Sequence, residues 1–478
     1  MRPLVVGFDL DMTLIDTRPG IAAVWDALSA ETGVPIDSAA AVSRLGPPLD
    51  EELAVWFPPE LHAEMGDRFR ALYPDLAVTP VPILPGAHEA VQAVRRHGGR
   101  VVVVTGKYEP NARLHLDHLG VEADVLVGWL WGAAKGDALR EHGASVYVGD
   151  HVGDVEGARA AGALSVGVAS GPMSAKVLTA AGADVVLEDL HDFPAWLDGH
   201  VLDVRLADLT AQLEGAGSLL VAFSGGADSA FLLAAATRTL GAGNVVAATA
   251  VSGSLPASEL DQARRFAADL GVRHLTPRTA EIDRAGYRAN AGDRCYFCKA
   301  ELLDVLAPLA SRHGLAHVAT GTNADDMVAG FRPGIRAAAE RGAVTPLHAA
   351  GLTKIQVREA SRRLGLVTWD KPAAACLASR VAFGLEVTPS RLARVERAEA
   401  ALRAVLGDAG TPVTDLRVRD LGGTARVEVD PWLVGLVAGS REAQAAVLDA
   451  GYAEVEIDPR GFRSGSMNEL LPDQERWR

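Results

Sequence analysis

LLVAFSGGADS, residues 219–229, predicts a strand, a glycine turn and the start of a helix. The apolar run ends at Phe223, Gly225 and Gly226 follow, and a helical pattern begins at Ala230. Glycines let the backbone approach an anion, and the free N–H groups and dipole of a helix N-terminus favour negative charge. The stretch therefore predicts a phosphate-binding loop, although many α/β units need such a turn for geometry alone.

The composition is that of a globular protein. The chain has 478 residues, which predicts roughly two to four domains, and 49% hydrophobic against 22% charged residues is ordinary for a folded protein. No apolar run reaches the roughly 18 residues that span a membrane. The N-terminus, MRPLVVGFDLD, indicates a strand and not a signal peptide, so we expect a cytoplasmic protein without membrane contact. The net charge of −15 argues against broad capture of nucleic acid.

The chain contains only three cysteines, Cys295, Cys298 and Cys376. An odd number in a cytoplasmic chain points away from a disulfide framework. Metal, cluster or nucleophile chemistry is the expectation, and three inert buried thiols are the alternative.

Polar residues follow the predicted strands of the N-terminal half. Residues 4–10 form a buried strand pattern ending in Asp9 and Asp11, which share one face if strand geometry continues that far. Two adjacent carboxylates repel each other unless a cation or proton lies between them. Strand 100–104 precedes Thr105, and strand 145–149 precedes Asp150. Strands that alternate with helices predict a parallel sheet with functional groups at the carboxyl ends of its strands.

DxDxT, a strand-end Thr, a Lys and GDxxxD, in this order, resemble the four motifs of the haloacid dehalogenase-like phosphatases. The resemblance covers about residues 1–195. It implies that Asp9 is the nucleophile that takes the phosphoryl group and Asp11 the general acid/base. Thr105 and Lys135, which opens a helical stretch, would hold the phosphate. A carboxylate cannot easily approach a phosphate dianion unless cations offset both charges.

The same resemblance implies a Mg²⁺ site. Asp150, with the Asp9 carboxylate and the backbone carbonyl of Asp11, would hold the ion, and Asp154 would support it. Met12 stands where these enzymes usually carry Gly, and the segment 16–82 would form a small helical cap. The alternative is a degenerate domain that serves as a scaffold or partner surface.

A second strand–helix alternation begins near residue 200, with strands at 219–223, 244–251 and 273–275. SGGxDS resembles the signature of the pyrophosphatase-loop ATP enzymes, and no Walker motif is present. The resemblance implies ATP, with pyrophosphate bound by Ser224, Gly225, Gly226 and Ser229, and Mg²⁺ bound with help from Asp228 and from Asp325 or Asp326. On this motif alone NAD synthetase, GMP synthetase, argininosuccinate synthase and the tRNA-thiolating enzymes all remain open.

Later motifs select among these enzymes. RCYFCK (294–299), GTNADD (321–326), GLTK (351–354), WDKPAAACLASR (369–380) and GFRSGSMN (461–468) together resemble the LarE family of ATP-dependent sacrificial sulfur transferases. The family implies adenylylation of pyridinium-3,5-biscarboxylic acid mononucleotide and its conversion to a thiocarboxylate, a step in the synthesis of the nickel-pincer nucleotide. Cys376 would give up its sulfur and become dehydroalanine. Its thiolate needs positive charge nearby, for which Arg380 and Lys371 are the candidates.

The three cysteines allow a second sulfur source. Some LarE-like and tRNA-thiolating enzymes hold a [4Fe-4S] cluster with three cysteines and leave one iron free for an extra sulfide. Cys295, Cys298 and Cys376 match that number, and we favour this version over a sacrificial Cys376. A tRNA-thiolating enzyme is the rival function, and the negative net charge gives it no support.

The last part of the chain predicts a small α+β region. An amphipathic helix over 390–406 precedes strand patterns at 416–419, 425–429 and 453–457. The resemblance implies that Arg417 and Arg419 grip the phosphate of the substrate. A surface salt-bridge ladder is the alternative. We expect the polar terminus, 471–478, to be mobile.

The sequence thus predicts an α/β fusion with two doubly wound parallel sheets. The expected domains are a phosphatase domain over 1–200, an ATP-binding sulfur transferase domain over 201–385 and the α+β region over 386–478. The sequence does not identify the substrate of the phosphatase domain. We hypothesise that this domain removes a phosphate from a compound of the same pathway. Expected partners are a small-molecule nucleotide and other enzymes of nickel-pincer synthesis. LarE proteins can form hexamers, so a homo-oligomer is a further expectation.

Overall fold

The computed structural model describes residues 3–45, 48–328, 333–372, 375–463 and 466–470. The chain forms two compact units, Met1–Val201 and Leu202–Arg478. The expected mobile terminus lies outside the described residues, as does part of the motif at 461–468. Helix α10 (Phe193–Ala216) contains the division between the units.

Gly199 lies inside helix α10. The helix continues through this glycine, whose cost inside a helix is only about 1 kcal/mol. Leu197, Leu209 and Leu213 of the same helix are buried and offset that cost.

Unit 1 contains a six-stranded parallel sheet in the order β3-β2-β1-β4-β5-β6. The short edge strand β3 was not predicted. The strands are β1 (Val5–Phe8), β2 (Arg100–Val104), β3 (Val125–Val127), β4 (Val146–Gly149), β5 (Leu164–Val168) and β6 (Val185–Leu187). Val6 and Phe8 belong to one hydrophobic cluster and Val5 to another, so alternate residues of β1 face helices on opposite sides of the sheet. The covering helices are α5 (Ala87–Arg96), α6 (Glu109–Leu119), α7 (Lys135–Glu141), α8 (Val152–Ala161) and α9 (Ala175–Ala181).

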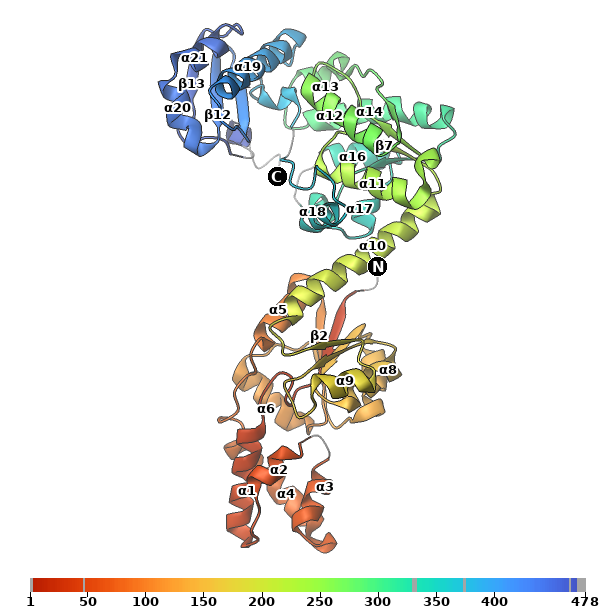
Figure 1. Ribbon diagram of the computed structural model, residues 1–478, viewed down its shortest axis with the longest axis vertical. Helices are drawn as coiled ribbons and strands as arrows, with labels where there is room; N and C mark the ends of the chain where they lie inside the picture. The colour runs from red at the N-terminus through yellow and green to blue at the C-terminus, as the bar shows by residue number, and fades with distance from the viewer. Residues whose placement is uncertain (1–2, 46–47, 329–332, 373–374, 464–465, 471–478) are drawn as a thin grey trace. The chain divides into compact units, whose positions relative to one another are not determined.

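A separate helical cap is inserted between β1 and β2, as predicted from the segment 16–82. Its helices are α1 (Arg18–Thr32), α2 (Ser38–Ser43), α3 (Leu49–Trp56) and α4 (His62–Leu76). These helices lie together, apart from the sheet, in red and orange (Figure 1). They share a hydrophobic core in which Trp25 and Phe69 pack with ring centroids 4.8 Å apart.

Unit 2 contains a second parallel sheet in the order β10-β7-β8-β9. Its strands are β7 (Leu219–Ala222), β8 (Val245–Ala248), β9 (Arg273–Leu275) and β10 (His317–Thr320). Leu219 and Leu220 of β7 point into different hydrophobic clusters, so both faces are covered here too. The accompanying helices are α11 (Ala227–Leu240), α12 (Ala257–Asp269), α13 (Ala285–Arg288), α14 (Arg294–Arg312), α15 (Ala324–Val328), α16 (Pro333–Glu340), α17 (Pro346–Ala349) and α18 (Lys354–Arg363). The doubly wound α/β class predicted for both halves is confirmed.

The last part of unit 2 is a three-stranded sheet with helices, drawn in blue in Figure 1. Strand β11 (Leu416–Asp420) pairs antiparallel with β12 (Thr424–Val429), which pairs parallel with β13 (Glu454–Ile457). Helices α19 (Pro389–Asp408), α20 (Val434–Gly439) and α21 (Arg441–Leu448) accompany them.

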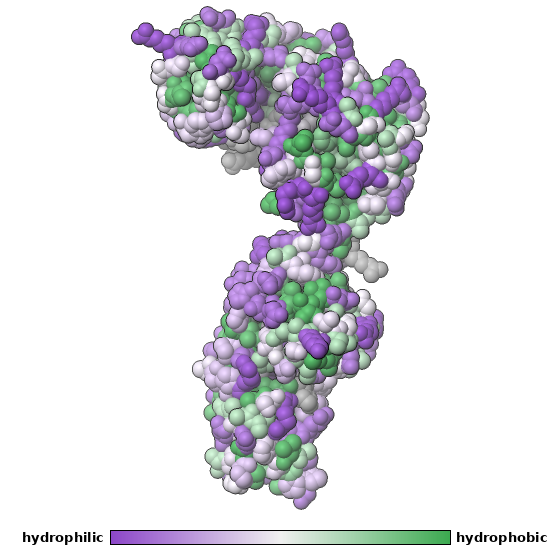
Figure 2. All heavy atoms as spheres, in the orientation of Figure 1, coloured by the Kyte–Doolittle hydropathy of each residue, from purple (hydrophilic) through white to green (hydrophobic). Residues whose placement is uncertain are grey.

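Hydrophilic and hydrophobic residues are interspersed on the face of both units drawn in Figure 2. Among the described residues, no helix combines the length and apolar character needed to cross a membrane.

Asp420 at the end of β11 is fully buried and holds the helix α19 to the sheet. Its carboxylate lies 2.9 Å from Arg391 Nη1 and 2.6 Å from Arg394 Nη2. We expect Asp420→Ala to lower the stability of this part by about 3 kcal/mol, because two arginines lose the carboxylate that offsets their charge. Hydrogen exchange of the β11 and β12 amides measures the change.

The matched control is Glu456→Ala, which removes an exposed ion pair with Arg426 on the same sheet. Its effect should stay below about 1 kcal/mol. Equal effects of the two variants would contradict the structural role of Asp420.

Candidate functional sites

The first site lies at the carboxyl ends of the unit 1 strands. Asp9 follows β1, Thr105 follows β2 and Asp150 follows β4. Lys135 Nζ donates to Asp9 Oδ1 at 3.0 Å and to Asp154 Oδ1 at 2.6 Å. The structure therefore brings the predicted nucleophile, lysine and acidic residues together.

Asp9 and Asp11 do not share the face of a strand, because β1 ends at Phe8. Met12 then adopts a φ of +61°, in the left-handed region that favours glycine. This conformation costs a larger residue on the order of 1 kcal/mol. It gives a physical reason for the glycine that similar phosphatases carry here.

Asp9, Asp150 and Asp154 are buried, and each offers a carboxylate oxygen within 4.8 Å of the others. Burial raises the pKa of the Asp9 carboxyl from 3.8 to about 7, with Lys135 opposing and Asp154 and Asp11 adding to the shift. Burial also raises the pKa of Asp150 well above its usual value, and Asp154 and Asp9 raise it further. The ammonium of Lys135 faces this charge.

These three carboxylates fit Mg²⁺, which prefers hard oxygen ligands and would offset their repulsion. The surrounding backbone leaves room for little else. A Cβ on Gly171 would lie 1.8 Å from Asp150 Oδ2, and one on Gly149 would lie 2.3 Å from the Asp154 carboxylate. Two glycines therefore allow the carboxylates to approach this closely.

Lys107 was missed by the sequence analysis. Its Nζ lies 2.9 Å from Asp11 Oδ1 and donates to the hydroxyl of Tyr73, on cap helix α4, at 2.9 Å. His115 Nε2 contacts the same hydroxyl at 2.9 Å, and burial lowers the pKa of this imidazole to about 4. A side chain of the cap thus reaches the predicted general acid/base through one lysine. Only the position of Lys107, two residues after Thr105, could have pointed to it.

The second site is the loop between β7 and α11. Gly225 has a φ of +74°, as a tight glycine turn requires. Ser229 Oγ donates to Gly226 O at 3.1 Å and lies 3.1 Å from Ser224 Oγ. Gly321, after β10, touches the N-terminus of α11, because a Cβ there would lie 2.8 Å from Ser229 N. A cavity of about 310 Å³ adjoins the loop and is lined in part by Asp228, Lys299 and Asp326.

The acidic residues near this loop have different surroundings. Asp228 Oδ2 lies 2.5 Å from Lys354 Nζ, and Asn323 Nδ2 donates to its Oδ1 at 3.3 Å. Asp325 is exposed and accepts from the backbone N–H of Lys354 at 2.7 Å. Of the two alternatives, Asp326 is therefore the one that lines the cavity.

The three cysteines form a third site. Cys295 and Cys298 are three residues apart at the start of α14 and so share a face of this helix. Burial raises the pKa of the Cys298 thiol, and Cys376, Glu281 and Cys295 raise it further, with Lys299 opposing. The structure therefore brings Cys376 near the CxxC pair.

Asn290 and Arg294 hold the segment with Cys376 against this pair. Asn290, at a φ of +53°, donates its amide to Ala382 O at 2.8 Å and Leu385 O at 2.9 Å. Arg294 Nη1 donates to Ala378 O at 2.8 Å. Asn290 was missed, because nothing in the local sequence shows contacts to carbonyls about 90 residues away.

The expected positive charge beside Cys376 needs correction. Lys371 Nζ donates to Gly225 O at 3.1 Å and pairs with Glu259 at 2.7 Å, so it braces the phosphate loop and not the thiol. Arg380 donates to the Cys376 carbonyl at 3.0 Å and pairs with Glu399 at 3.0 Å. Lys299 is the cation that acts on Cys298.

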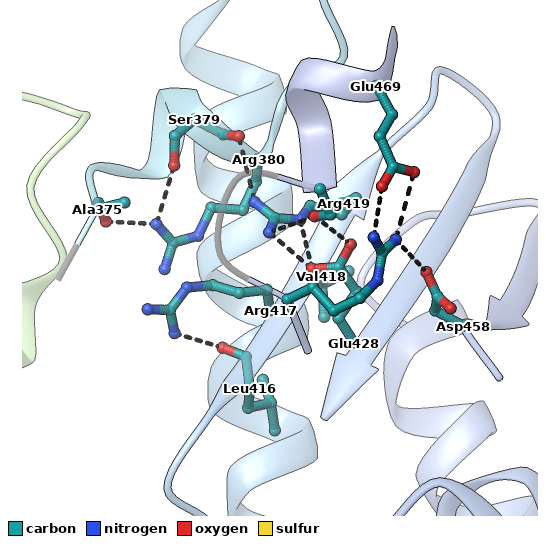
Figure 3. A network of polar contacts seen from close by, with 12 residues as sticks. Ala375, Ser379, Arg380, Leu416, Arg417, Val418, Arg419, Glu428, Asp458 and Glu469 are labelled. Carbon is teal, nitrogen blue, oxygen red and sulfur yellow. Dashed lines mark hydrogen bonds and ion pairs between the residues drawn. The ribbon is translucent and has the colours of Figure 1, made fainter. Parts of the chain in front are cut away.

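Arg380, Arg417 and Arg419 lie close together (Figure 3). Arg417 and Arg419 are buried, which excludes the surface ladder considered from the sequence. Burial lowers the pKa of Arg417, and the positive charges of Arg380 and Arg419 lower it further. Arg419 pairs with Glu428 at 2.6 Å, and Arg417 donates to Leu416 O at 2.7 Å. The cluster concentrates positive charge and favours an anion.

Comparison with known proteins assigns each half. Residues 6–159 match the haloacid dehalogenase-like hydrolase family, and residues 129–193 match the HAD-hydrolase-like family. A haloacid dehalogenase-like hydrolase structure from Streptococcus pneumoniae is 21% identical with a TM-score of 0.38, and the match covers 41% of this chain and 98% of that one.

The other half resembles two bacterial proteins. The pyridinium-3,5-bisthiocarboxylic acid mononucleotide synthase of Lactiplantibacillus plantarum is 33% identical over 272 residues, 56% of this chain and 96% of that protein. An uncharacterized protein of Synechocystis is 39% identical over 274 residues, 57% of this chain and 99% of that protein.

The acidic cluster predicts a stability effect of Mg²⁺. Without the ion, stability should fall as pH rises from about 4 through about 7, because folded Asp9 keeps a proton that the unfolded chain loses. Above this range we expect Mg²⁺ to raise the Tm, and the rise should shrink as pH falls below about 7. Thermal melts with and without Mg²⁺ test this.

Asp150→Asn should remove most of the Mg²⁺ effect and leave the Mg²⁺-free Tm unchanged or higher, since one repelling carboxylate is gone. Asp137→Asn, at an exposed position on α7, is the control and should keep the effect. A full Mg²⁺ response in the Asp150 variant would contradict the assignment.

Proposed function

This chain belongs to the LarE family of sulfur transferases, with a haloacid dehalogenase-like hydrolase domain before it, and we propose that it combines ATP-dependent sulfur transfer with phosphomonoester hydrolysis. The sulfur acceptor is pyridinium-3,5-biscarboxylic acid mononucleotide. The observation that carries the proposal is that unit 2 contains three features together. They are the phosphate loop, the three cysteine thiols and the cluster of Arg380, Arg417 and Arg419.

The phosphate loop activates the acceptor. A carboxylate oxygen of the substrate attacks the α-phosphorus of ATP, and pyrophosphate leaves into the loop of Ser224–Ser229 backbone and hydroxyl groups. Lys371, held on Gly225 O, fixes the loop. Asp228 and Asp326 both line the cavity beside the loop and would bind a Mg²⁺ that accompanies ATP. AMP becomes the leaving group of the acyl carbon.

Sulfur then replaces AMP. In the sacrificial version the Cys376 thiolate attacks the acyl carbon, AMP departs, and loss of the Cα proton breaks the Cβ–Sγ bond. The products are a thiocarboxylate and dehydroalanine at position 376. In the version that we favour, Cys376 persists as a ligand.

The three thiols match the number of cysteines that would hold a [4Fe-4S] cluster with one iron left free. Burial and neighbouring negative charge raise the pKa of Cys298, so it is a poor free nucleophile, whereas a bound metal cation would hold its thiolate form. Cys295, Cys298 and Cys376 would hold the cluster, which would supply a sulfide not taken from the chain. Asn290 and Arg294 fix the loop that carries the third ligand.

Arg417, beside Arg380 and Arg419, would bind the substrate phosphate. The positive charges of Arg380 and Arg419 lower the pKa of Arg417, although each of these two arginines also pairs with a glutamate. A phosphate dianion would relieve the repulsion among the three guanidinium groups.

Anaerobic purification distinguishes the two sulfur sources. We expect bound iron, repeated turnover and an intact Cys376. Cys295→Ser should lose both the iron and sulfur transfer, while pyrophosphate release with ATP and acceptor continues. Mass spectrometry of the Cys376 peptide and iron analysis are the measurements.

Single-turnover activity in Cys295→Ser, with the Cys376 peptide lighter by the mass of H₂S, would instead establish sacrifice. Cys376→Ser abolishes transfer in both versions and serves as the common control. Absence of pyrophosphate release in wild-type protein would contradict the activation step.

Unit 1 supports hydrolysis of a phosphomonoester. The Asp9 carboxylate attacks phosphorus, and the departing alkoxide takes a proton from Asp11. Water then attacks the aspartyl phosphate, returns a proton to Asp11 and releases phosphate. Lys135 offsets the charge of Asp9, and Lys107 orients Asp11. Mg²⁺ held by Asp9, Asp150 and Asp154 would neutralise the phosphate.

Asp9→Asn should abolish Mg²⁺-dependent hydrolysis of p-nitrophenyl phosphate by the full chain, because the amide cannot form the phosphoenzyme. Sulfur transfer should be unaffected. Asp75→Asn, at an exposed position on cap helix α4, is the control. If wild-type and Asp9→Asn protein are equally inactive, the hydrolase domain is a scaffold.

A further inference from the structure

A cavity of about 560 Å³ lies between the cap and the sheet of unit 1. Asp9, Asp11, Thr105 and Lys135 line it, so it contains the proposed phosphate chemistry. Its volume is in the range of small-molecule sites, roughly 300–1,000 Å³, and exceeds the need of a phosphate on a two-carbon group. Aromatic side chains also line it: Trp25, Phe69, Tyr73, Tyr108, Trp129 and Trp131.

Trp129 is unusual among these aromatic residues. The residue is 53% exposed although it lines the cavity, and its backbone has a φ of +59°. The left-handed region is strongly disfavoured for a bulky residue. Residues held in such conformations cluster at ligand-binding sites, where the surrounding structure fixes them.

The backbone around Trp129 is hydrogen-bonded to the segment after β2 that contains Thr105, the predicted phosphate ligand, and Lys107. Trp129 N donates to Lys107 O at 3.0 Å, and Leu130 N donates to Thr105 O at 3.1 Å. Trp131 packs on Gly106 so closely that a Cβ there would lie 2.4 Å from the indole Nε1. The backbone that carries the Trp129 indole is therefore fixed relative to Thr105 and Lys107, which lie beside the reacting carboxylates.

Neighbouring groups make an amphipathic wall. The ring of Tyr108 lies 5.1 Å from that of Trp129, and the guanidinium of Arg70, on cap helix α4, lies 5.9 Å from the Trp129 ring. Arg70 already pairs with Asp67 at 3.0 Å. The surface formed by Trp129, Tyr108 and Arg70 therefore suits a planar ring of the substrate better than a second strongly anionic group beside its phosphate.

We propose that unit 1 hydrolyses a phosphomonoester whose leaving group carries a planar ring, the class of the nucleoside monophosphates, and that Trp129 is the specificity-determining residue on which the ring stacks. This inference rests on the proposed phosphatase function. Asp9 displaces the ring-bearing alcohol from phosphorus, and water then cleaves the aspartyl phosphate, so no reactant besides water is needed.

The test uses the full chain with Mg²⁺ and without ATP. Two ring phosphates, AMP and nicotinamide mononucleotide, are compared with phosphoglycolate, and phosphate release gives kcat/KM. Hydrolysis is the chosen readout because AMP could also bind unit 2. We expect kcat/KM of wild-type protein to be higher for at least one of the two ring phosphates than for phosphoglycolate. The comparison of AMP with nicotinamide mononucleotide shows whether a purine or a pyridine ring is preferred.

Trp129→Ala should lower the ratio of kcat/KM for the ring phosphate over phosphoglycolate at least about fivefold, mainly through KM, since stacking of a base on an aromatic side chain contributes this much or more. Trp129→Phe should keep most of the ratio. Trp432→Ala removes a tryptophan that is 63% exposed elsewhere and should leave the ratio unchanged. Thermal melts check that each variant folds.

An unchanged ratio in folded Trp129→Ala overturns the role of Trp129. Turnover of phosphoglycolate without turnover of either ring phosphate overturns the substrate class and leaves the phosphatase function standing. Turnover of neither class overturns the phosphatase function and this inference together.

Discussion

Like charges held together in the interior are the constraint on which both halves of this protein depend. In unit 1, Asp9, Asp150 and Asp154 each have a carboxylate oxygen within 4.8 Å of the others, and the ammonium of Lys135 donates to two of them. Burial strengthens their repulsion, and the raised pKa values of Asp9 and Asp150 are its consequence. In unit 2, arginines and cysteines gather in the same way. Each cluster would be stabilised by a ligand of opposite charge, and this makes each one a candidate site.

The parallel sheets explain why these charges meet. Chemistry-bearing residues of unit 1 follow the carboxyl ends of β1, β2 and β4, and those of the phosphate loop follow β7 and β10. Neighbouring parallel strands end at one edge, so residues that are far apart in sequence become neighbours. Glycines then allow close approach, as Gly171 does beside Asp150 and Gly321 beside Ser229. The cap and the C-terminal sheet add groups from outside the two sheets.

How far the sequence predicts this structure depends on the range of the contact. Asp9, Lys135 and Asp150 were found because each follows a recognisable strand or opens a helix. Lys107 was missed, because its importance comes from Tyr73, 34 residues away on the cap. Lys371 was assigned to Cys376, five residues away, whereas the fold places it on Gly225, 146 residues away. A charged side chain near a motif says little about its partner, because a long flexible stem reaches several elements.

The sequence by itself determined the two α/β halves, the phosphate loop, the acidic motif residues and the three thiols, because alternating strands and helices and the glycine turn are local patterns. Only the tertiary structure decided which groups face one another. It joined Asp11 to the cap through Lys107, placed Cys376 beside Cys298, buried Arg417 with Arg380 and held Trp129 in a left-handed conformation beside Thr105 and Lys107. These relations depend on burial and on contacts across many residues, which no local pattern encodes.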